Sequence, residues 1–396
     1  MSMKPSNVAL ASDVEIVRRL LAHIDAGTTD EGESWREPVA NYLDPARFAA
    51  ELKLLRSLPS VLIPSAALPS PGDHIERVVF GAPLFAVRDR EQRVRVFRNA
   101  CRHRGAALVQ GSGCSRALVC PYHGWTYRLD GSLSHVPHAH GFPDLDVAAR
   151  GLVEVVSAEV AGLIVIAAVA PTSRSADATS ALGALGDGSA WRDKLQPELR
   201  VFDISSRVLP MNWKLLVEQF LEGYHIRTTH RDTFYPVQYD NLNVVELFGP
   251  HSRVTYPFRN IERLRNRPEA DWTVGHRVTF LYQLFPNVML ATFPDRVVMV
   301  AIDPIDLDHS LVSTYSMGEP RETAAGAAQP RERSDGINLV QRGTLEDNAM
   351  TAAVQKGLLA GANEFLEFGR HESAIGHFHA TLRAQLASMT DVQLRS

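Results

Sequence analysis

The apolar positions near the start of the chain recur at the spacing of an amphipathic helix. The stripe is formed by Val14, Val17, Leu20, Leu21 and Ile24. This spacing predicts a helix over 12–24, and Ser12 followed by Glu15 makes a capping-box pattern at its start. Asp44-Pro45 is typical of an N-cap and a first helical residue, so a second helix is expected from there to about residue 55.

Between residues 61 and 169 the pattern changes to short β-type runs separated by turn residues. The clearest runs are 78–80, 84–88, 94–98, 118–120 and 163–168. Asp130-Gly131, after the run 125–129, is a favourable hairpin turn. This region is therefore predicted to form a small, mostly antiparallel β domain.

The second half of the chain mixes helical and strand patterns. A helix is predicted over 213–225, strands over 277–285, 288–293, 296–302 and 310–317, and helices over 346–368 and 373–386. Residues 171–190 read as a linker and 321–336 as a mobile loop. The expected fold class is α+β, in which helices cover an antiparallel sheet in the helix-grip manner. The predicted domains are a helical extension (1–45), a β domain (46–170) and a second domain (171–396).

Composition restricts the function classes. A net charge of −4 gives no reason to expect nucleic acid or an acidic membrane as partner. Three cysteines are too few for a disulfide scaffold and fit a reducing compartment. We find neither a signal peptide nor an apolar run long enough to span a membrane. A cytoplasmic protein is expected.

Two short segments of the β region combine cysteine with histidine. Cys101 and His103 are separated from Cys120 and His123 by sixteen residues. Zinc accepts such a set, although usually with both cysteines in one half. A [2Fe–2S] cluster in which one iron takes both cysteines and the other takes both histidines suits the mixed halves better.

The residues around these ligands carry a resemblance to a known family. The segments Cys101-Arg102-His103-Arg104-Gly105 and Cys120-Pro121-Tyr122-His123-Gly124-Trp125 resemble the paired loops of Rieske domains. The resemblance implies that Cys101, His103, Cys120 and His123 hold a Rieske cluster. Cys114 lies outside both motifs and is expected to be an ordinary thiol.

A second set of metal-binding residue types follows in the segment 212–230. If the segment is helical, Glu218, Glu222 and His225 share one face. His225 and His230 are five residues apart, about 140° around an ideal helix, so they can bind one metal only if the helix ends or bulges between them. Two histidines and one carboxylate form the facial triad of non-haem iron oxygenases.

This segment also resembles the catalytic domain of Rieske oxygenases. In that family a helix with Asn-Trp-Lys, an acidic pair and Tyr-His precedes a second histidine, and the third iron ligand comes from a late helix. The resemblance assigns the mononuclear iron to His225, His230 and Asp347, with Glu346 as the neighbouring candidate. Gln219 occupies a position near the iron, where it hydrogen-bonds a ligand or packs. Tyr224 is expected to support the adjacent ligand.

The resemblance also implies a reaction and partners. Electrons come from NAD(P)H through a separate reductase, in some members with a ferredoxin, and cross from one subunit's cluster to its neighbour's iron, where O₂ reacts with a small organic substrate. A homotrimer is implied. Glu222 occupies the place of the carboxylate that bridges the two centres. Most members have Asp there, whereas some enzymes that oxidise quaternary amines have Glu.

Three classes of function remain open at this point: an oxygenase, of which two kinds are considered, an electron carrier and a structural zinc protein. A hydroxylating or demethylating oxygenase is favoured over an electron carrier without oxygenase chemistry, since the iron ligands are present. The second kind of oxygenase is a dioxygenase that cis-dihydroxylates aromatic rings. A structural zinc protein is the remaining class. Aromatic compounds and methylated amines are the candidate substrates, and Glu222 favours the amines. The late histidines His371, His377 and His379 are expected to be solvated or packing residues.

Overall fold

The computed structural model describes the backbone of residues 10–169, 188, 190–322, 328–330 and 334–389. Side chains are described for the same residues except those within 320–338. The chain separates into two compact units. The small unit is Arg56–Arg200, and the large unit combines Met1–Leu55 with Val201–Ser396. The α+β class predicted from the sequence is confirmed, with strands in both units and helices concentrated in the large one.

The small unit is built from short antiparallel strands. They are β2 (Ser60–Pro64), β3 (Asp73–Val79), β4 (Ala82–Arg88), β5 (Val94–Arg98), β6 (Ser112–Cys114), β7 (Leu118–Val119), β8 (Thr126–Tyr127), β9 (Leu133–His135), β10 (Glu154–Val155), β11 (Ser157–Val160) and β12 (Leu163–Ile166). They form sheets in the orders β10-β5-β4-β3-β6, β11-β12-β2 and β7-β8-β9. The predicted turn at Asp130-Gly131 joins β8 to β9, and Gly131 has a φ of 86°, which glycine adopts without strain.

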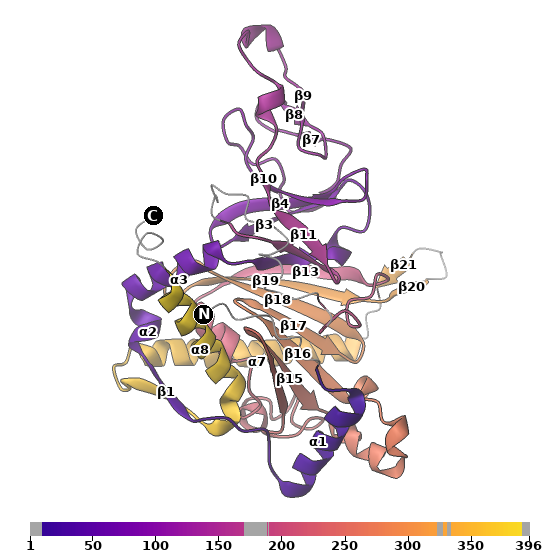
Figure 1. Ribbon diagram of the computed structural model, residues 1–396, viewed down its shortest axis with the longest axis vertical. Helices are drawn as coiled ribbons and strands as arrows, with labels where there is room; N and C mark the ends of the chain where they lie inside the picture. The colour runs from indigo at the N-terminus through magenta and orange to yellow at the C-terminus, as the bar shows by residue number, and fades with distance from the viewer. Residues whose placement is uncertain (1–9, 170–187, 189, 323–327, 331–333, 390–396) are drawn as a thin grey trace. The chain divides into compact units, whose positions relative to one another are not determined.

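The large unit is organised around one seven-stranded sheet (Figure 1). Its strands are β13 (Arg200–Leu209), β14 (Val244–Phe248), β15 (His251–Pro257), β16 (Val278–Leu284), β17 (Val288–Phe293), β18 (Arg296–Pro304) and β19 (Ser310–Gly318). Their order is β13-β19-β18-β17-β16-β15-β14. The six strands β14 to β19 form an antiparallel meander, in which each strand pairs with the next one in sequence, and β13 lies beside β19 at the edge.

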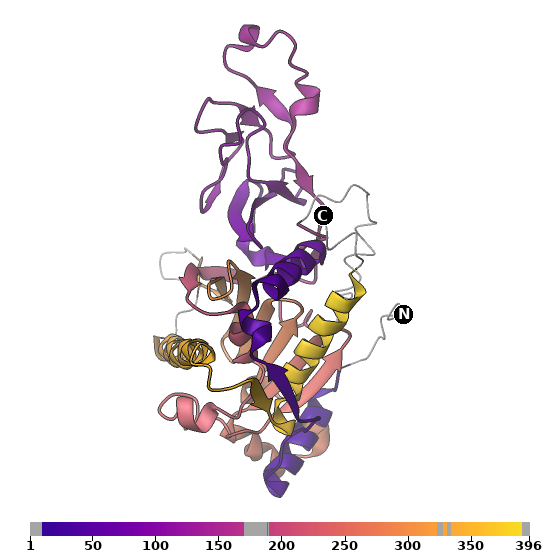
Figure 2. The same ribbon diagram turned by 90° about the vertical axis from the view of Figure 1, so that its left-hand side faces the viewer.

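Helices gather beside this sheet (Figures 1 and 2). They are α1 (Asp13–Ala26), α2 (Ala40–Leu43), α3 (Pro45–Ser57), α5 (Trp213–Glu218), α6 (Ile226–Thr229), α7 (Ser334–Leu358) and α8 (Ser373–Ser388). Two strand pairs complete the unit: β1 (Trp35–Pro38) with β22 (Phe365–Phe368), and β20 (Pro320–Glu322) with β21 (Ala328–Pro330). In the described part of the chain, no helix has the length and apolar character of a membrane span.

Two helix starts follow the predicted caps. The Ser12 side chain accepts a hydrogen bond from the Glu15 backbone N–H, and α1 begins at the next residue, Asp13. The Asp44 carboxylate accepts one from the Ala46 N–H at 2.9 Å as α3 begins. Both caps satisfy N–H groups that have no partner inside the helix.

Two predicted helices are wrong in extent. The helix predicted over 213–225 ends at Glu218, where the Phe220 N–H bonds to Val217 and the chain tightens. The helix predicted over 346–368 begins at Ser334 and ends at Leu358. Its last residues form strand β22 instead, because Phe368 stacks on Trp35 of the paired strand β1.

The two predicted loops have different outcomes. Strands β20 and β21 and the start of α7 lie within 321–336, so the described part of that segment is not simply a loop. The predicted linker 171–190 lies almost wholly outside the described residues.

The Asn-Trp-Lys segment fixes the start of α5. The Asn212 side chain caps the helix by accepting from the Lys214 N–H at 3.0 Å. Trp213 donates its indole N–H to Glu51, and the Lys214 ammonium lies 2.7 Å from the same carboxylate. Lys214 and Glu51 are both buried. The motif therefore joins α5 to α3 through a buried ion pair.

Removing Glu51 is expected to destabilise the large unit strongly. Glu51→Leu leaves the buried Lys214 ammonium without this counter-ion, a change that costs about 3–5 kcal/mol of unfolding free energy. The measurement is the urea unfolding midpoint. The double variant Glu51→Leu, Lys214→Met should recover most of the lost unfolding free energy. The control Glu367→Ala removes an exposed ion pair with Arg36 and should change the unfolding free energy by less than about 1 kcal/mol. An unchanged urea midpoint in Glu51→Leu would contradict a stabilising role for the ion pair between Glu51 and Lys214.

His379 is a buried packing residue, one of the two outcomes expected for the late histidines. Its ring is buried between two carboxylates, with Nε2 2.9 Å from Glu218 and Nδ1 3.4 Å from Glu37. Burial alone would lower the pKa of His379, but the hydrogen bonds to Glu218 and Glu37 raise it. The Tyr42 hydroxyl donates to Glu218 at 2.7 Å. These contacts tie α8, α5 and the N-terminal segment into one core.

Candidate metal centres

The turn between α5 and α6 brings two histidines to one point. The Glu222 carboxylate accepts from the backbone N–H groups of Tyr224 and His225, which stabilises the turn that follows α5. Helix α6 is a single turn that begins at Ile226, directly after His225, and ends before His230. The sequence predicts that the helix ends or bulges between His225 and His230. Helix α5 instead ends earlier, at Glu218, and the single turn of α6 lies between the two histidines, with His225 and His230 at its two ends.

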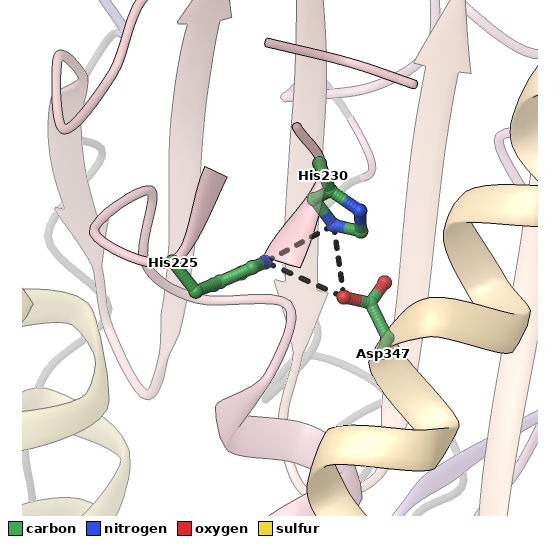
Figure 3. Close-up of side chains that lie close together, drawn as sticks. All are labelled: His225, His230 and Asp347. Atoms are coloured by element: carbon green, nitrogen blue, oxygen red, sulfur yellow. Dashed lines mark hydrogen bonds and ion pairs between the residues drawn. The ribbon is translucent and has the colours of Figure 1, made fainter. Parts of the chain in front are cut away.

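Three donor atoms converge there (Figure 3). The Nε2 atoms of His225 and His230 are 3.2 Å apart. Asp347, projecting from α7, places Oδ1 3.4 Å from the Nε2 of His225 and 2.9 Å from that of His230. Two imidazoles and one carboxylate meeting at one point are the donor set that non-haem iron accepts, and they leave other coordination positions open.

A second carboxylate lies behind each histidine. The Nδ1 atom of His225 is hydrogen-bonded to Glu222. The Nδ1 atom of His230 lies 2.8 Å from Glu346, which also accepts from the Thr233 hydroxyl at 2.6 Å. Such contacts orient a metal-binding imidazole and make it more basic. Glu346, the alternative ligand candidate, thus approaches the far side of His230, whereas Asp347 faces both Nε2 atoms.

The charges of this group are strongly coupled. Burial alone would lower the pKa of His225, but its hydrogen bonds to Asp347 and Glu222 raise it to about 10. Burial alone would raise the pKa of Asp347, but hydrogen bonds to both histidines lower it. A cation entering the group must therefore displace protons from the imidazoles, so its affinity is expected to fall as the pH falls.

The structure places the remaining predicted residues of this segment less centrally. Gln219 accepts a hydrogen bond from Thr351 of α7 at 2.5 Å, one helical turn after Asp347. The ring of Tyr224 is exposed and lies against His371, with ring centroids 4.5 Å apart. Gln219 therefore links α5 to α7, and the ring contact found for Tyr224 is with His371.

Tyr256 is a neighbour of this site that the sequence did not indicate. Its hydroxyl donates to the Phe220 carbonyl at 2.8 Å. Burial raises the pKa of Tyr256, and the nearby Glu222 and Asp347 carboxylates raise it further. Only the register of β15 against the helices brings it here, and no local motif marks it.

The two loops of the small unit have the same backbone pattern. The Cys101 N–H bonds to the Ala106 carbonyl and the Gly105 N–H to the Cys101 carbonyl. In the second loop the Cys120 N–H bonds to the Trp125 carbonyl and the Gly124 N–H to the Cys120 carbonyl. Both glycines have positive φ, 80° and 73°. The repeat explains why each motif needs a glycine four residues after its cysteine.

The side chains of these loops form two pairs. Cys101 and Cys120 are buried free thiols, and burial raises the pKa of Cys101. The Tyr127 hydroxyl accepts from the Arg102 N–H at 3.0 Å and lies 3.3 Å from Cys101 Sγ. The rings of His103 and His123 have centroids 4.6 Å apart. Their Nδ1 atoms are buried and without hydrogen-bond partners among the described residues.

The positions of the donor atoms distinguish between a zinc site and a [2Fe–2S] cluster in the loops. A tetrahedral zinc ion needs all its donor atoms around one point. Among the described residues, two groups of three or more donors have ligand atoms within 4.8 Å of one another. These are His225, His230 and Asp347, and an exposed trio of Asp306, Asp308 and His309. The loop residues form no such group, so a thiol pair and an imidazole pair fit the two irons of a Rieske cluster better.

Comparison with known families covers both units. Residues 59–149 match the Rieske [2Fe-2S] domain family. Residues 189–388 match the family described as ring hydroxylating alpha subunit (catalytic domain).

Individual relatives agree with this assignment. The carnitine monooxygenase oxygenase subunit of Escherichia coli K12 is 30% identical over 373 residues, covering 88% of this chain and 93% of that protein. The chloroplastic choline monooxygenase of Spinacia oleracea is 26% identical over 365 residues, covering 88% of this chain and 78% of that protein.

Solved structures share the fold. A quaternary ammonium Rieske monooxygenase bound to L-carnitine has a TM-score of 0.70 at 21% identity, covering 90% of this chain and 96% of that one. Naphthalene 1,2-dioxygenase from Rhodococcus has a TM-score of 0.70 at 18% identity, covering 95% and 99%. Taken with the two family matches, these relatives show that the chain belongs to the Rieske oxygenases, enzymes with a [2Fe–2S] cluster and a mononuclear iron, as a catalytic (alpha) oxygenase subunit.

Proposed function

We propose that this enzyme hydroxylates or oxidatively demethylates a small methylated amine with O₂, using electrons from NAD(P)H that arrive through a separate reductase. The observation that carries the proposal is the convergence of His225, His230 and Asp347, each histidine with a carboxylate at its Nδ1 atom. An electron carrier without oxygenase chemistry has no use for this second site.

The two metal centres are assigned as follows. His225, His230 and Asp347 hold the mononuclear iron, which when bound supplies O₂ activation. Cys101 and Cys120 hold one iron of the cluster, and His103 and His123 hold the other. Glu222 and Glu346 keep the iron-binding imidazoles oriented. Gln219 positions α7 through Thr351, and Tyr224 packs outside the site.

The arrangement of the whole enzyme is part of the proposal. The cluster belongs to the segment 46–170 and the iron to 171–396, with 1–45 as an N-terminal extension. Glu222, hydrogen-bonded to the iron ligand His225, would connect it to a cluster histidine of the neighbouring subunit, in the homotrimer that the resemblance to Rieske oxygenases implies. The reductase passes electrons to the cluster directly or through a ferredoxin. The enzyme works in the cytoplasm.

Replacing Tyr127 by Phe is expected to lower the reduction potential of the cluster. The Tyr127 hydroxyl lies 3.3 Å from Cys101 Sγ, and a hydrogen bond to a ligand sulfur favours the more negative, reduced state. Loss of one such bond should shift the potential down by a few tens of millivolts, on the order of 1 kcal/mol for one electron. A redox titration followed by electron paramagnetic resonance measures the shift. A higher potential in the variant would contradict this role.

Glu346 and Asp347 are expected to differ in their effect on iron content. Glu346→Ala removes the partner of His230 Nδ1 but no iron ligand, so iron affinity should fall about 10–100-fold. Asp347→Ala removes a ligand and should leave the site without iron after gel filtration. Iron titration with a competing chelator compares them. Stronger iron loss in Glu346→Ala than in Asp347→Ala would mean that Glu346 is the iron ligand and that Asp347 is not.

Two features favour a methylated amine as substrate. The relatives named above include carnitine and choline monooxygenases. Glu222 stands at the proposed bridging position, where the resemblance associates glutamate, in place of the more usual aspartate, with some enzymes that oxidise quaternary amines. Tyr256 places an aromatic ring beside the site, and aromatic rings attract ammonium groups. Ring cis-dihydroxylation remains the second candidate, because naphthalene dioxygenase shares the fold.

A substrate screen tests the proposal. The purified, metal-loaded enzyme is supplied with a surrogate reductase and NADH, and O₂ uptake and product are measured for carnitine, choline, glycine betaine and a panel of aromatic acids. Product from at least one amine, with O₂ uptake matching product, is expected. If only the aromatic substrates give product, and the products are cis-diols, the proposal is wrong and ring cis-dihydroxylation is the function.

A further inference from the structure

Phe234 contacts both the second histidine and helix α7. Its ring meets the His230 imidazole at right angles, with an interplanar angle of 89° and ring centroids 5.0 Å apart. The same ring reaches α7 at Gly343, where an added Cβ would lie 2.3 Å from Phe234 Cε2. Atoms in a close-packed protein do not approach one another so closely without something moving. Only glycine therefore leaves room for the ring at this position of α7.

Gly343 shares a face of α7 with the carboxylates of the iron site. It precedes Glu346 by three residues and Asp347 by four, and residues at these spacings lie one above the other on a helix. Gly343 is buried, whereas Arg342 beside it is exposed. Glycine weakens a helix interior, so a glycine there needs a packing reason. The close approach of the Phe234 ring supplies that reason.

The segment from His230 to Phe234 meets this face of α7 at successive points. His230 Nε2 lies 2.9 Å from Asp347 Oδ1, and His230 Nδ1 lies 2.8 Å from Glu346. The Thr233 hydroxyl donates to Glu346 at 2.6 Å. The carbonyl of Phe234 accepts two backbone hydrogen bonds, at 2.8 and 2.9 Å, which hold its backbone in the turn. The Phe234 ring adds the last contact, one helical turn before Asp347.

The hydrogen bond at Nδ1 does not by itself fix the plane of the His230 ring. An imidazole held at one nitrogen can still tilt about that contact, and the tilt swings Nε2 away from the point where the three donor atoms meet. A perpendicular aromatic ring restricts the tilt, and such edge-to-face contacts are favourable. Contacts that orient a metal-binding imidazole strengthen metal binding.

We propose that Phe234 is a positioning residue for the iron site, and that Gly343 is required because it lets the Phe234 ring lie against both α7 and His230. This inference rests on the proposed function, because it takes His230 as an iron ligand. It gives α7 a second task besides carrying Asp347, which is to leave space for the ring that orients the histidine.

Gly343→Ala tests the proposal because it adds one methyl group and removes no polar contact. The methyl group collides with the Phe234 ring, which must move and release His230, so Fe(II) affinity should fall about tenfold or more. Competition with a chelator measures the affinity. The electron paramagnetic resonance spectrum of the bound iron, with nitric oxide added as a probe, reports the ligand geometry and should also change.

Gly357→Ala is the matched control in the same helix. A Cβ at Gly357 would meet nothing within 4 Å, so the same substitution adds a methyl group without a collision. Both the Fe(II) affinity and the spectrum should remain those of the wild type.

Phe234→Leu shortens the side chain that the new methyl group meets. Alone it should lower Fe(II) affinity by a smaller factor, about threefold, because the perpendicular ring is lost and apolar bulk remains. Combined with Gly343→Ala, it should bind iron more tightly than Gly343→Ala alone, because the collision is removed. Two independent losses would instead add.

Wild-type affinity and spectrum in Gly343→Ala or in Phe234→Leu would overturn the inference and leave the proposed function standing. A double variant that binds iron more weakly than Gly343→Ala would overturn it as well. If Gly343→Ala does not fold, the affinity and spectrum of Phe234→Leu decide. Full iron affinity in His230→Ala, or no iron bound by the wild type beyond the cluster, would overturn the proposed function itself.

Discussion

His225→Ala should abolish product formation while leaving the protein coloured. The substitution removes one of three convergent donor atoms, so the iron site keeps two ligands and should lose its metal. The cluster ligands Cys101, His103, Cys120 and His123 are untouched, and their paired loops are held by their own backbone hydrogen bonds. We expect a loss in kcat of at least about a thousandfold, measured as product formed per chain per second at saturating substrate, with an unchanged cluster spectrum.

His371→Ala is the control for this experiment. His371 contacts Tyr224 and contributes no donor to the three-atom group, so both activity and iron content should remain close to wild type. Substantial turnover by His225→Ala would remove His225 from the iron site. Loss of cluster colour in the same variant would contradict the separation of the two centres.

Glu222→Gln should slow electron transfer to the iron while both metals remain bound. Glutamine keeps the size of the side chain and an oxygen that can accept from His225 Nδ1, but it removes the charge that the proposed bridge uses. Single-turnover kinetics with a pre-reduced cluster measure cluster oxidation and product formation together. Both rates should fall by at least about tenfold, in step, in the variant.

Glu222→Asp separates the two roles of this residue. The shorter carboxylate keeps the charge but retracts by about 1.5 Å. If Glu222 contacts a neighbouring cluster, the single-turnover rates of Glu222→Asp should therefore lie between those of the wild type and those of Glu222→Gln. Equal single-turnover rates in wild type and Glu222→Gln would exclude a bridging role and leave Glu222 as a support for His225 alone.

The sequence predicted best where chemistry is local. Each Rieske loop is specified by a few consecutive residues, and the backbone pattern of Cys101 to Ala106 is repeated from Cys120 to Trp125. Likewise Ser12 and Asp44 cap their helices through neighbours only a few residues away. Such features depend little on the rest of the fold.

Prediction failed where distant segments decide the conformation. Strand β22 forms because Trp35, more than three hundred residues earlier, pairs with Phe368, although the local pattern favours a helix. Glu346 and Asp347 are chemically equivalent in the sequence, and only the rotation of α7 assigns one to each side of His230. The place of Tyr256 beside the proposed iron ligands depends on the register of β15, which no short motif encodes.

The metal content of the purified protein tests the central claim most directly. Two centres of the assigned types require about three irons and two acid-labile sulfides per chain. Elemental analysis with sulfide determination on the brown-red wild-type protein should give these values, and His225→Ala should give about two irons with the same sulfide. A colourless protein with zinc in place of iron and no sulfide would contradict the assignment of both centres.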